Sequence, residues 1–276
     1  MVVEGRLGDD GLVRYDVVEG VATITLHNPD RKNAWSLAME HQYFACLDEA
    51  AGATDVRAIV VTGAGNAFCP GMDMVALEQT AASGGLERAG RRPMHYALGI
   101  PKPMIAAING ACAGIGLIQA LYCDLRFAAR GARMSTSFTR RGLGAEYGTS
   151  WMLPRLVGVE RALDLLLSGR TFDAEEAHEM RLVGRLCDPA EVLRDAQAYA
   201  ADLARYSSPR AMAAVRYQVY ADLGDDFETS WDRTLGIMQT MNAHPDFAEG
   251  VASFTERRPP AFDPLPPGFG ESLRDG

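Results

Sequence analysis

The sequence lacks the closely spaced cysteines that metal sites and redox motifs use. Its five cysteines are odd in number and widely scattered: Cys46, Cys69, Cys112, Cys123 and Cys187. No CxxC pair or Cys/His cluster occurs, so we expect neither a bound metal nor a disulfide framework. Cys112 and Cys123 stand in apolar runs, which is typical of small buried side chains. A reduced, cytoplasmic setting fits this usage.

Long apolar runs are also missing. The sequence nowhere reaches about 18 consecutive apolar residues, the length that a membrane-spanning helix needs. The N-terminal stretch MVVEGRLGDDGLV has neither the basic start nor the apolar centre of a secretory signal. We therefore expect no membrane partner.

Basic residues are outnumbered, with 27 Lys and Arg against 36 Asp and Glu and a formal net charge of −9. Nucleic acids and anionic membranes require broad basic surfaces, so neither is an expected partner. An anionic ligand would need a local cluster of Arg and Lys. The 276 residues, 47% of them hydrophobic, suffice for one large α/β domain with a smaller appendage.

Strand and helix patterns alternate in the first half of the chain. Residues 13–26 predict two strands joined by a turn at Glu19 and Gly20. Ser36 is a predicted N-cap of the helix that follows. Residues 58–62 and 104–108 are apolar and predict buried strands, each followed by a glycine-rich loop and a helical pattern. This repeated order predicts an α/β fold with parallel strand pairing.

The second half is mostly helical in pattern. We expect a surface loop over 84–92, a short helix over 94–98, and a helix over 153–167 that breaks at Gly158. Helices continue from residue 191 until the proline-rich segment RRPPAFDPLPPGFG. The expected organisation is a core over residues 1–203 and a helical C-terminal region over residues 204–276.

The two glycine-rich loops carry the first chemical signal. A loop that leads from a strand into a helix presents unpaired backbone N–H groups, and glycine lets a ligand approach them. The segment GAGNAFCPG lacks the Lys-Ser/Thr of a P-loop, and residues 110–116 lack the acid of a dinucleotide-binding motif. Two converging loops would suit an oxygen that becomes negative during a reaction. For either loop alone, a structural turn is the default interpretation.

Five motifs resemble the crotonase (enoyl-CoA hydratase/isomerase) superfamily and cover almost the whole chain. They are ITLHNPDRKNAW, TGAGNAFCPGMDM, INGACAGIG with CDLRFAA, GTSWMLPRLVG, and DFAEGVASFTERRPPAF. The resemblance implies a spiral of stacked β-β-α turns, followed by a helical trimerisation region. It also implies a homotrimer or a dimer of trimers, an acyl-CoA thioester as the substrate, and no cofactor apart from the substrate's own coenzyme A.

The resemblance further implies which positions form the site. Main-chain N–H groups of Met72 and Ile115 would form an oxyanion hole, so their side-chain identities do not matter. Residues 31–34 would lie along the nucleotide and pantetheine of coenzyme A. Phe254 and Arg257 would reach its phosphate or adenine end, often from a neighbouring subunit; the alternative for Arg257 is a solvated helix end. The positions expected to contact substrate are Arg31, Lys32, Asn33, Ala34, Pro70, Gly71, Met72, Asp73, Met74, Ile115, Ile118, Phe138, Phe254 and Arg257.

The catalytic acids depart from those of typical hydratases. Where the family carries two glutamates, this sequence has Ile118 and Phe138. Glu146 aligns with an acid that some isomerases of the superfamily use as a base. A carboxylate partly desolvated by apolar neighbours such as Trp151 makes a useful general base. The alternative role for Glu146 is to stabilise the start of the helix near Ser150.

Three hypotheses follow. The first is an isomerase that shifts a double bond in an acyl-CoA with Glu146 as the base; the second is a hydratase that uses Glu146 alone. The third is a relative that binds acyl-CoA without catalysis. We expect an apolar acyl pocket, and loop-fixing roles for Asp73 and Asp124. We expect a core role for His95 and minor contributions from Arg140 and Tyr147. The residues predicted to line the pocket are Met74, Met94, Leu98, Ile118 and Phe138.

Overall fold

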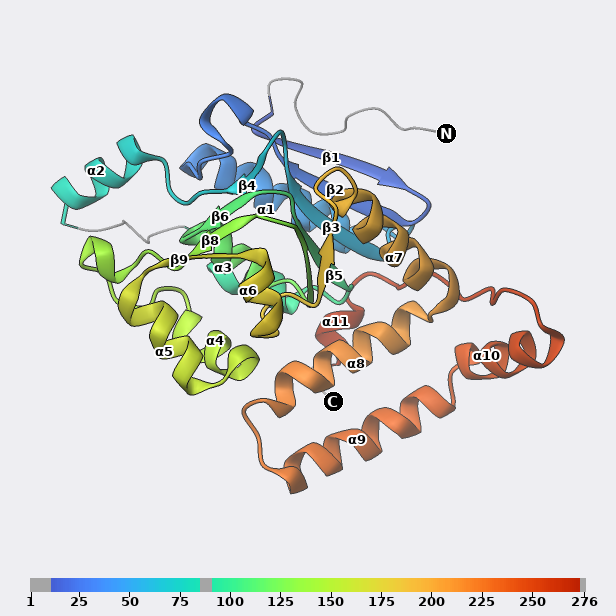
Figure 1. Ribbon diagram of the computed structural model, residues 1–276. Helices are drawn as coiled ribbons and strands as arrows, with labels where there is room; N and C mark the ends of the chain where they lie inside the picture. Colours follow the sequence, from blue (N-terminus) through green and yellow to red (C-terminus); the bar gives the residue numbers. More distant parts are fainter. Residues whose placement is uncertain (1–10, 85–90, 274–276) are drawn as a thin grey trace.

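The strands of this computed structural model, which describes residues 11–84 and 91–273, form two sheets (Figure 1). The larger sheet runs in the order β1-β2-β3-β5-β7-β10. Its strands are β1 (Val13–Val18), β2 (Val21–Leu26), β3 (Ala58–Gly63), β5 (Met104–Ile108), β7 (Leu125–Ala129) and β10 (Arg185–Cys187). The smaller sheet runs in the order β4-β6-β8-β9. Its strands are β4 (Ala67–Cys69), β6 (Ala111–Ala113), β8 (Arg133–Ser135) and β9 (Thr171–Asp173).

The larger sheet begins with a hairpin and continues in parallel. Strands β1 and β2 pair antiparallel, with Val13 opposite Leu26. Glu19 and Gly20 between them both have positive φ, which suits the right-handed twist of a tight hairpin. Strands β2, β3, β5, β7 and β10 then pair in parallel. Every residue of β3 and β5 is buried, which confirms the prediction of buried parallel strands.

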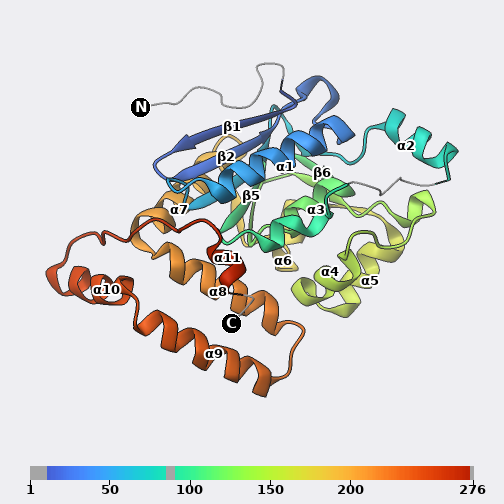
Figure 2. The same cartoon turned by 180° about the vertical axis from the view of Figure 1, so that it is seen from behind.

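Helices cover both faces of the larger sheet. Helix α1 (Leu37–Gly52) and helix α7 (Val192–Tyr206) lie on opposite faces, as Figures 1 and 2 show together. Ser36 is the N-cap of α1, and its Oγ accepts a hydrogen bond of 3.2 Å from the N–H of Met39. The cap prediction is therefore confirmed. The two helices bury the strand residues from both sides and form the core.

Two strands of the smaller sheet, β4 and β6, lie inside segments that we expected to be loops. Strands β4 and β6 have three residues each and pair in parallel, with Ala67 opposite Ala111. The turns that precede them are joined by Asn109. Its Nδ2 donates to the Gly63 carbonyl at 2.8 Å, and its Oδ1 accepts from the Gly63 N–H at 3.2 Å. This pairing holds the two strand ends side by side, so β4 and β6 leave the larger sheet together.

The remaining helices follow the predicted order with local differences. Residues 94–98 form part of a 3-10 helix, η2 (Met94–Gly99), rather than an α-helix. The expected long helix does break at Gly158 into two helices. The loop expected over residues 84–92 lies for the most part outside the described residues. The helices of this half are α2 (Met74–Ala82), α3 (Ile115–Leu121), α4 (Thr149–Val157), α5 (Val159–Ser168) and α6 (Ala174–Glu179), with short 3-10 turns η1 (Pro29–Arg31) and η3 (Thr139–Arg141).

The C-terminal helices are α8 (Pro209–Asp222), α9 (Phe227–Asn242), α10 (Pro245–Glu256) and α11 (Phe269–Ser272). Helices α9 and α10 extend away from the sheets, whereas the chain returns in α11 to lie beside α8 (Figures 1 and 2). Buried Arg216 joins α8 to the core, because its Nε donates to Asp124 at 2.9 Å. The boundary expected at residue 203 falls within α7, and a division into two domains stays a prediction. None of the described helices has the length and apolar character to cross a membrane.

A substitution of Gly110 tests whether the close packing of the two turns supports the fold. A Cβ placed on Gly110 would lie 2.0 Å from the carbonyl oxygen of Asn66. Gly110→Ala should therefore lower the free energy of unfolding by about 1–3 kcal/mol, the usual range for overpacking, as measured by chemical denaturation. The matched control is Gly52→Ala at the end of α1, where a Cβ meets nothing within 4 Å. Equal stability of the two variants would contradict this account of the packing.

Candidate active site

Three loops meet at one edge of the smaller sheet. Strands β4, β6 and β8 are parallel neighbours, so the loops that follow their carboxyl ends lie at the same edge. A cavity of about 70 Å³ opens between these loops. Its lining residues are Pro70, Gly71, Met72, Leu77, Gly114, Ile115, Thr136, Ser137, Phe138, Arg141, Leu143, Glu146 and Tyr147. We call this space the reaction cavity.

The first two loops touch each other through glycines. A Cβ on Gly114 would lie 3.9 Å from the Cα of Gly71, and a Cβ on Gly71 would lie 3.5 Å from the carbonyl oxygen of Ala113. Both glycines have positive φ, 119° for Gly71 and 49° for Gly114, a region that other residues rarely adopt. The absence of side chains at these two positions lets the loops approach closely.

Trp35 fixes the loop that carries Met72. The N–H of Trp35 donates to the Gly71 carbonyl at 2.8 Å, and the N–H of Asp73 donates to the Trp35 carbonyl at 2.9 Å. Trp35 is itself buried, and its Nε1 donates to the carboxylate of Glu40 at 3.1 Å. The N–H of Met72, which lies between these two bonds, donates to no other described residue. It is therefore available to a ligand in the reaction cavity.

Ile115 carries the second amide at the start of α3. The N–H of Gly114 donates to the Ser135 carbonyl at 3.0 Å, which ties this loop to β8. The first bond of the helix runs from the Ile118 N–H to the Gly114 carbonyl at 3.0 Å. The N–H of Ile115 lies before that bond and has no acceptor among the described residues. The structure thus brings Met72 and Ile115 to one cavity; that they bind an oxyanion stays a prediction.

Glu146 provides a carboxylate at the same cavity. It is half-buried and lies in the segment that leads into α4. The N-cap of α4 is Gly148. Glu146 contributes its main-chain carbonyl to the helix start, which accepts a hydrogen bond from the Thr149 N–H at 3.0 Å. The location of Glu146 agrees with its predicted role as a base.

The positions that replace the two family glutamates are apolar and buried. Phe138 lines the reaction cavity, whereas Ile118 lies in the core of α3 and lines neither this cavity nor the neighbouring pocket. Neither side chain can accept a proton. Of the described residues that line the reaction cavity, Glu146 alone carries a carboxylate.

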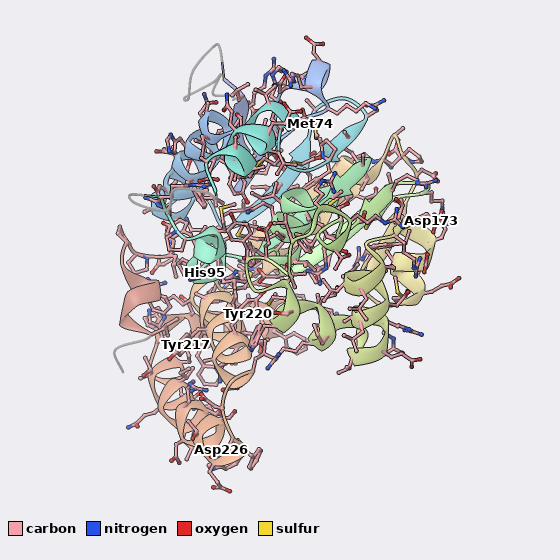
Figure 3. All side chains as sticks on the ribbon, turned by 90° about the vertical axis from the view of Figure 1, so that its left-hand side faces the viewer. Met74, His95, Asp173, Tyr217, Tyr220 and Asp226 are labelled. Carbon is pink, nitrogen blue, oxygen red and sulfur yellow. The ribbon has the colours of Figure 1, made fainter. Side chains whose placement is uncertain are left out.

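A larger pocket lies beside the reaction cavity, with a volume of about 520 Å³. It is lined by Arg91, Arg92, Pro93, Met94, His95, Leu98, Tyr122, Tyr147, Gly148, Trp151 and Met152. Met94 and Leu98 therefore lie where the acyl pocket was expected. Met74 does not, because it begins α2 with 56% of its surface exposed. Figure 3 shows Met74 and His95 on separate elements, α2 and η2. We call the 520 Å³ pocket beside η2 the acyl pocket.

The predicted coenzyme A contacts are divided. Arg31 and Lys32 are exposed beside the first loop, and the Arg31 guanidinium pairs with the Asp73 carboxylate at 2.6 Å. Ala34 is half-buried next to them. Asn33 points inward, because its Nδ2 donates to the Ala67 carbonyl at 2.7 Å, and it has no surface left for a ligand. The sequence interpretation of Asn33 as a cofactor contact is therefore wrong.

Phe254 and Arg257 lie at the end of α10, far from the reaction cavity of the same chain (Figure 1). Phe254 is 86% exposed, and Arg257 forms the C-cap of the helix with φ of 56°. A single chain does not join these residues to the site. Their contact with coenzyme A across a subunit boundary stays a prediction.

Several further residues were assigned a role or overlooked. The Oδ1 of Asp73 accepts from the Val75 N–H at 3.0 Å, which confirms its loop-fixing role. The Asp124 carboxylate accepts from the Met104 N–H at 2.8 Å, which confirms the same role. His95 is exposed and lines the acyl pocket, so its expected core role is wrong. The sequence interpretation missed Ser137 of the reaction cavity, since nothing in the sequence marked β8 as the strand before it.

Comparisons with known proteins agree with this geometry. A family model described as enoyl-CoA hydratase/isomerase matches residues 16–264. A probable enoyl-CoA hydratase from Rhodobacter capsulatus is 39% identical over 255 residues, covering 91% of this chain and 97% of the relative. The 1,2-epoxyphenylacetyl-CoA isomerase of Escherichia coli is 31% identical, covering 89% and 96%. The crystal structure of a probable enoyl-CoA hydratase/isomerase from Mycobacterium abscessus superimposes with a TM-score of 0.85 at 30% identity, covering 92% and 99%.

Replacing Ile115 with proline removes its amide hydrogen together with a buried isoleucine side chain. Ile115 is the first residue of α3, a position that proline tolerates because its N–H has no helical partner. If this amide stabilises developing charge, Ile115→Pro should lower kcat about 100- to 1000-fold, measured with a saturating acyl-CoA substrate. Ile115→Ala keeps the amide and controls for the side chain. Similar kcat values for the two variants would show that the Ile115 N–H takes no part.

Proposed function

This chain belongs to the enoyl-CoA hydratase/isomerase family, whose members act on acyl-CoA thioesters, and we propose that it shifts a double bond within the acyl group. The observation that carries the proposal is the composition of the reaction cavity. Two main-chain amides without an acceptor among the described residues, those of Met72 and Ile115, share it with one carboxylate of its described lining, that of Glu146.

The first step removes a proton from carbon. The Glu146 carboxylate takes the proton from the acyl chain, and the electrons of the broken C–H bond move onto the thioester carbonyl oxygen. The N–H groups of Met72 and Ile115 donate to that oxygen as it becomes negative. Each such donor typically stabilises the transition state by about 3–4 kcal/mol. The amides are held by the fold before the substrate binds, so no reorganisation accompanies the charge.

The second step returns the proton. The Glu146 carboxylic acid donates it to a different carbon of the conjugated enolate, the double bond moves, and the carboxylate is regenerated. One acid-base group is sufficient because the group that takes the first proton also delivers the second, and its acidic proton can exchange with solvent between the two steps. Apolar Phe138 and Leu143 line the same cavity and limit water near the carboxylate. The reaction needs no cofactor beyond the coenzyme A that is part of the substrate.

Hydration is the second candidate function. The relatives include proteins named enoyl-CoA hydratase, and Ser137 offers a place for water. Ser137 has a positive φ of 60°, lines the reaction cavity, and lies with its Oγ 2.7 Å from the Oγ of Ser135. Ser135 donates to the Gly169 carbonyl at 3.1 Å, so Ser137 donates to Ser135 and keeps acceptor capacity for a water. Glu146 would then activate that water alone.

Solvent exchange at the acyl α-carbon tests the role of Glu146. With an enoyl-CoA in heavy water, the wild-type protein should exchange the α-proton and shift the double bond. Glu146→Gln cannot accept a proton and should lose both activities by at least about 100-fold, whereas Glu160→Gln on the exposed face of α5 should keep both.

The same assay separates the alternatives. Hydration of crotonyl-CoA at a rate normal for hydratases, abolished in Glu146→Gln, would overturn the isomerase proposal in favour of hydration. Acyl-CoA binding with neither α-proton exchange nor a double-bond shift in the wild-type protein would establish the non-catalytic alternative. Undiminished exchange in Glu146→Gln would assign the base to another group.

We further propose that the chain assembles as a homotrimer or a dimer of trimers through its C-terminal helices. These helices expose large apolar side chains at helical spacing, a pattern typical of an interface. On α9 they are Phe227, Trp231, Leu235 and Met238, and on α10 they are Phe247, Val251 and Phe254. Assembly would also explain how Phe254 and Arg257 reach coenzyme A, since a neighbouring subunit would supply them.

Native mass tests the assembly. Sedimentation equilibrium should give a multiple of three times the 29.8 kDa chain. Trp231 is 51% exposed on the apolar face of α9. Trp231→Asp places a charge on this face and should dissociate the assembly. Val18→Asp makes the same kind of change on exposed β1 and should not. A monomeric wild-type protein would contradict the proposal.

A further inference from the structure

Tyr147 separates the two spaces that a bound acyl group would occupy. It lines both the reaction cavity and the acyl pocket, and no other described residue lines both. The reaction cavity holds about 70 Å³ and the acyl pocket about 520 Å³. The volume of liquid water is about 30 Å³ per molecule, so the reaction cavity has room for the thioester carbonyl and its nearest carbons. The remainder of a longer acyl group must pass Tyr147.

The backbone of Tyr147 is held in an unusual conformation. Its φ is 48°, and the following Gly148 has φ of 74°, so two consecutive residues are left-handed. A bulky aromatic residue rarely adopts this region without support from its surroundings. The support comes from Tyr122, whose buried hydroxyl donates to the Tyr147 carbonyl at 2.5 Å. The position of Tyr147 is therefore fixed by α3, the helix that begins with Ile115.

The electrostatic neighbours of the Tyr147 phenol line the acyl pocket. Burial raises the pKa of Tyr122 to about 12, and the neighbouring Tyr147 phenol adds to this shift. The pKa of Arg91 is also raised, mainly by its hydrogen bond to Glu40, with Tyr147 again among the contributors. Tyr122 and Arg91 both line the acyl pocket. Tyr147 therefore lines the reaction cavity together with Glu146 and the acyl pocket together with Tyr122 and Arg91.

Trp151 and Met94, which also line the acyl pocket, each make contacts that restrict the side chain. The guanidinium carbon of Arg155 lies 3.9 Å from the centre of the Trp151 ring, and Arg155 also donates to the Trp151 carbonyl at 2.9 Å. Met94 is buried and belongs to the hydrophobic core. Buried Met94 therefore has little room to shift for a bulky acyl group, because side chains in the core are closely packed.

From this geometry we propose that Tyr147 is a specificity-determining residue, whose ring admits straight acyl chains to the acyl pocket and excludes chains branched close to the conjugated thioester. The inference rests on the proposed function, since it assumes that the thioester lies in the reaction cavity. It names a substrate class, straight-chain enoyl thioesters long enough to extend past Tyr147. A chain with a methyl branch at the carbon that passes the ring would meet the phenol.

Two isomeric substrates test the proposal. Hex-2-enoyl-CoA and 4-methylpent-2-enoyl-CoA have equal numbers of carbons and differ only in the branch. The wild-type protein should prefer the straight isomer, in binding and in kcat/KM, by about tenfold or more, as expected for one excluded methyl group. Tyr147→Gly should erase this preference by raising the affinity and the kcat/KM for the branched isomer. Glycine adopts positive φ without strain, so the variant keeps the backbone of the loop.

Two further variants give the experiment its controls. Tyr147→Phe keeps the ring and should keep the preference for the straight isomer, which separates the ring from the hydroxyl. Tyr206→Ala removes an exposed tyrosine at the end of α7 and should change neither the binding nor the kcat/KM of either isomer. Tighter binding and a higher kcat/KM for the branched isomer cannot arise from a general loss of stability.

Binding and turnover are measured separately, so the two proposals can fail independently. Equal selectivity of the wild-type protein and Tyr147→Gly, with α-proton exchange intact, would overturn the role of Tyr147 alone. A change in binding selectivity with no exchange in any variant would support the role of Tyr147 and contradict the proposed catalysis. Weak binding of both isomers to the wild-type protein, unimproved in Tyr147→Gly, would overturn the role of Tyr147.

Discussion

The parallel pairing of three short strands is the constraint on which the site depends. Strands β4, β6 and β8 place their carboxyl ends at one edge. The main-chain pairing of the strands therefore brings the following loops together and does not require contacts between loop side chains. Glycines at positions 71 and 114 allow these loops to touch, and Gly110 allows the turn before β6 to pack closely against the turn before β4. The geometry of the cavity thus follows from backbone hydrogen bonds, the most regular interactions in the molecule.

Use of the main chain separates the proposed oxyanion site from side-chain identity. Met72 and Ile115 present their amides whatever their side chains are, so the fold can keep this feature while other positions vary. Ile118 and Phe138 have taken positions where related hydratases carry acids, and the reaction cavity is left with Glu146. A single acid favours double-bond migration, in which one group takes a proton and then gives one back. It disfavours hydration, in which two groups act on the water and on the substrate.

Much of the fold could be predicted because its signals are local. The hairpin at Glu19, the cap at Ser36 and the buried strand β3 each follow from a few neighbouring residues. Strands β4 and β6 were missed because three residues are too few to show an alternation. Their strand character comes from pairing with segments distant in sequence, which no local pattern records.

The site was predicted in part, for a similar reason. The resemblance identified Met72, Ile115 and Glu146, and the fold brings all three to one cavity. It misassigned Asn33, since a buried amide that bonds to two distant carbonyls has the same sequence signature as an exposed contact. It gave Tyr147 little weight, because a residue that divides two cavities is recognised only when both cavities are seen.

A crystal structure of the protein with a bound acyl-CoA analogue would test the central claim most directly. The account predicts that the thioester oxygen lies about 2.7–3.1 Å from both the Met72 and the Ile115 nitrogens. It also predicts that the Glu146 carboxylate faces the carbons between which the double bond moves. A thioester oxygen directed away from either amide, or bound in another cavity, would contradict the account.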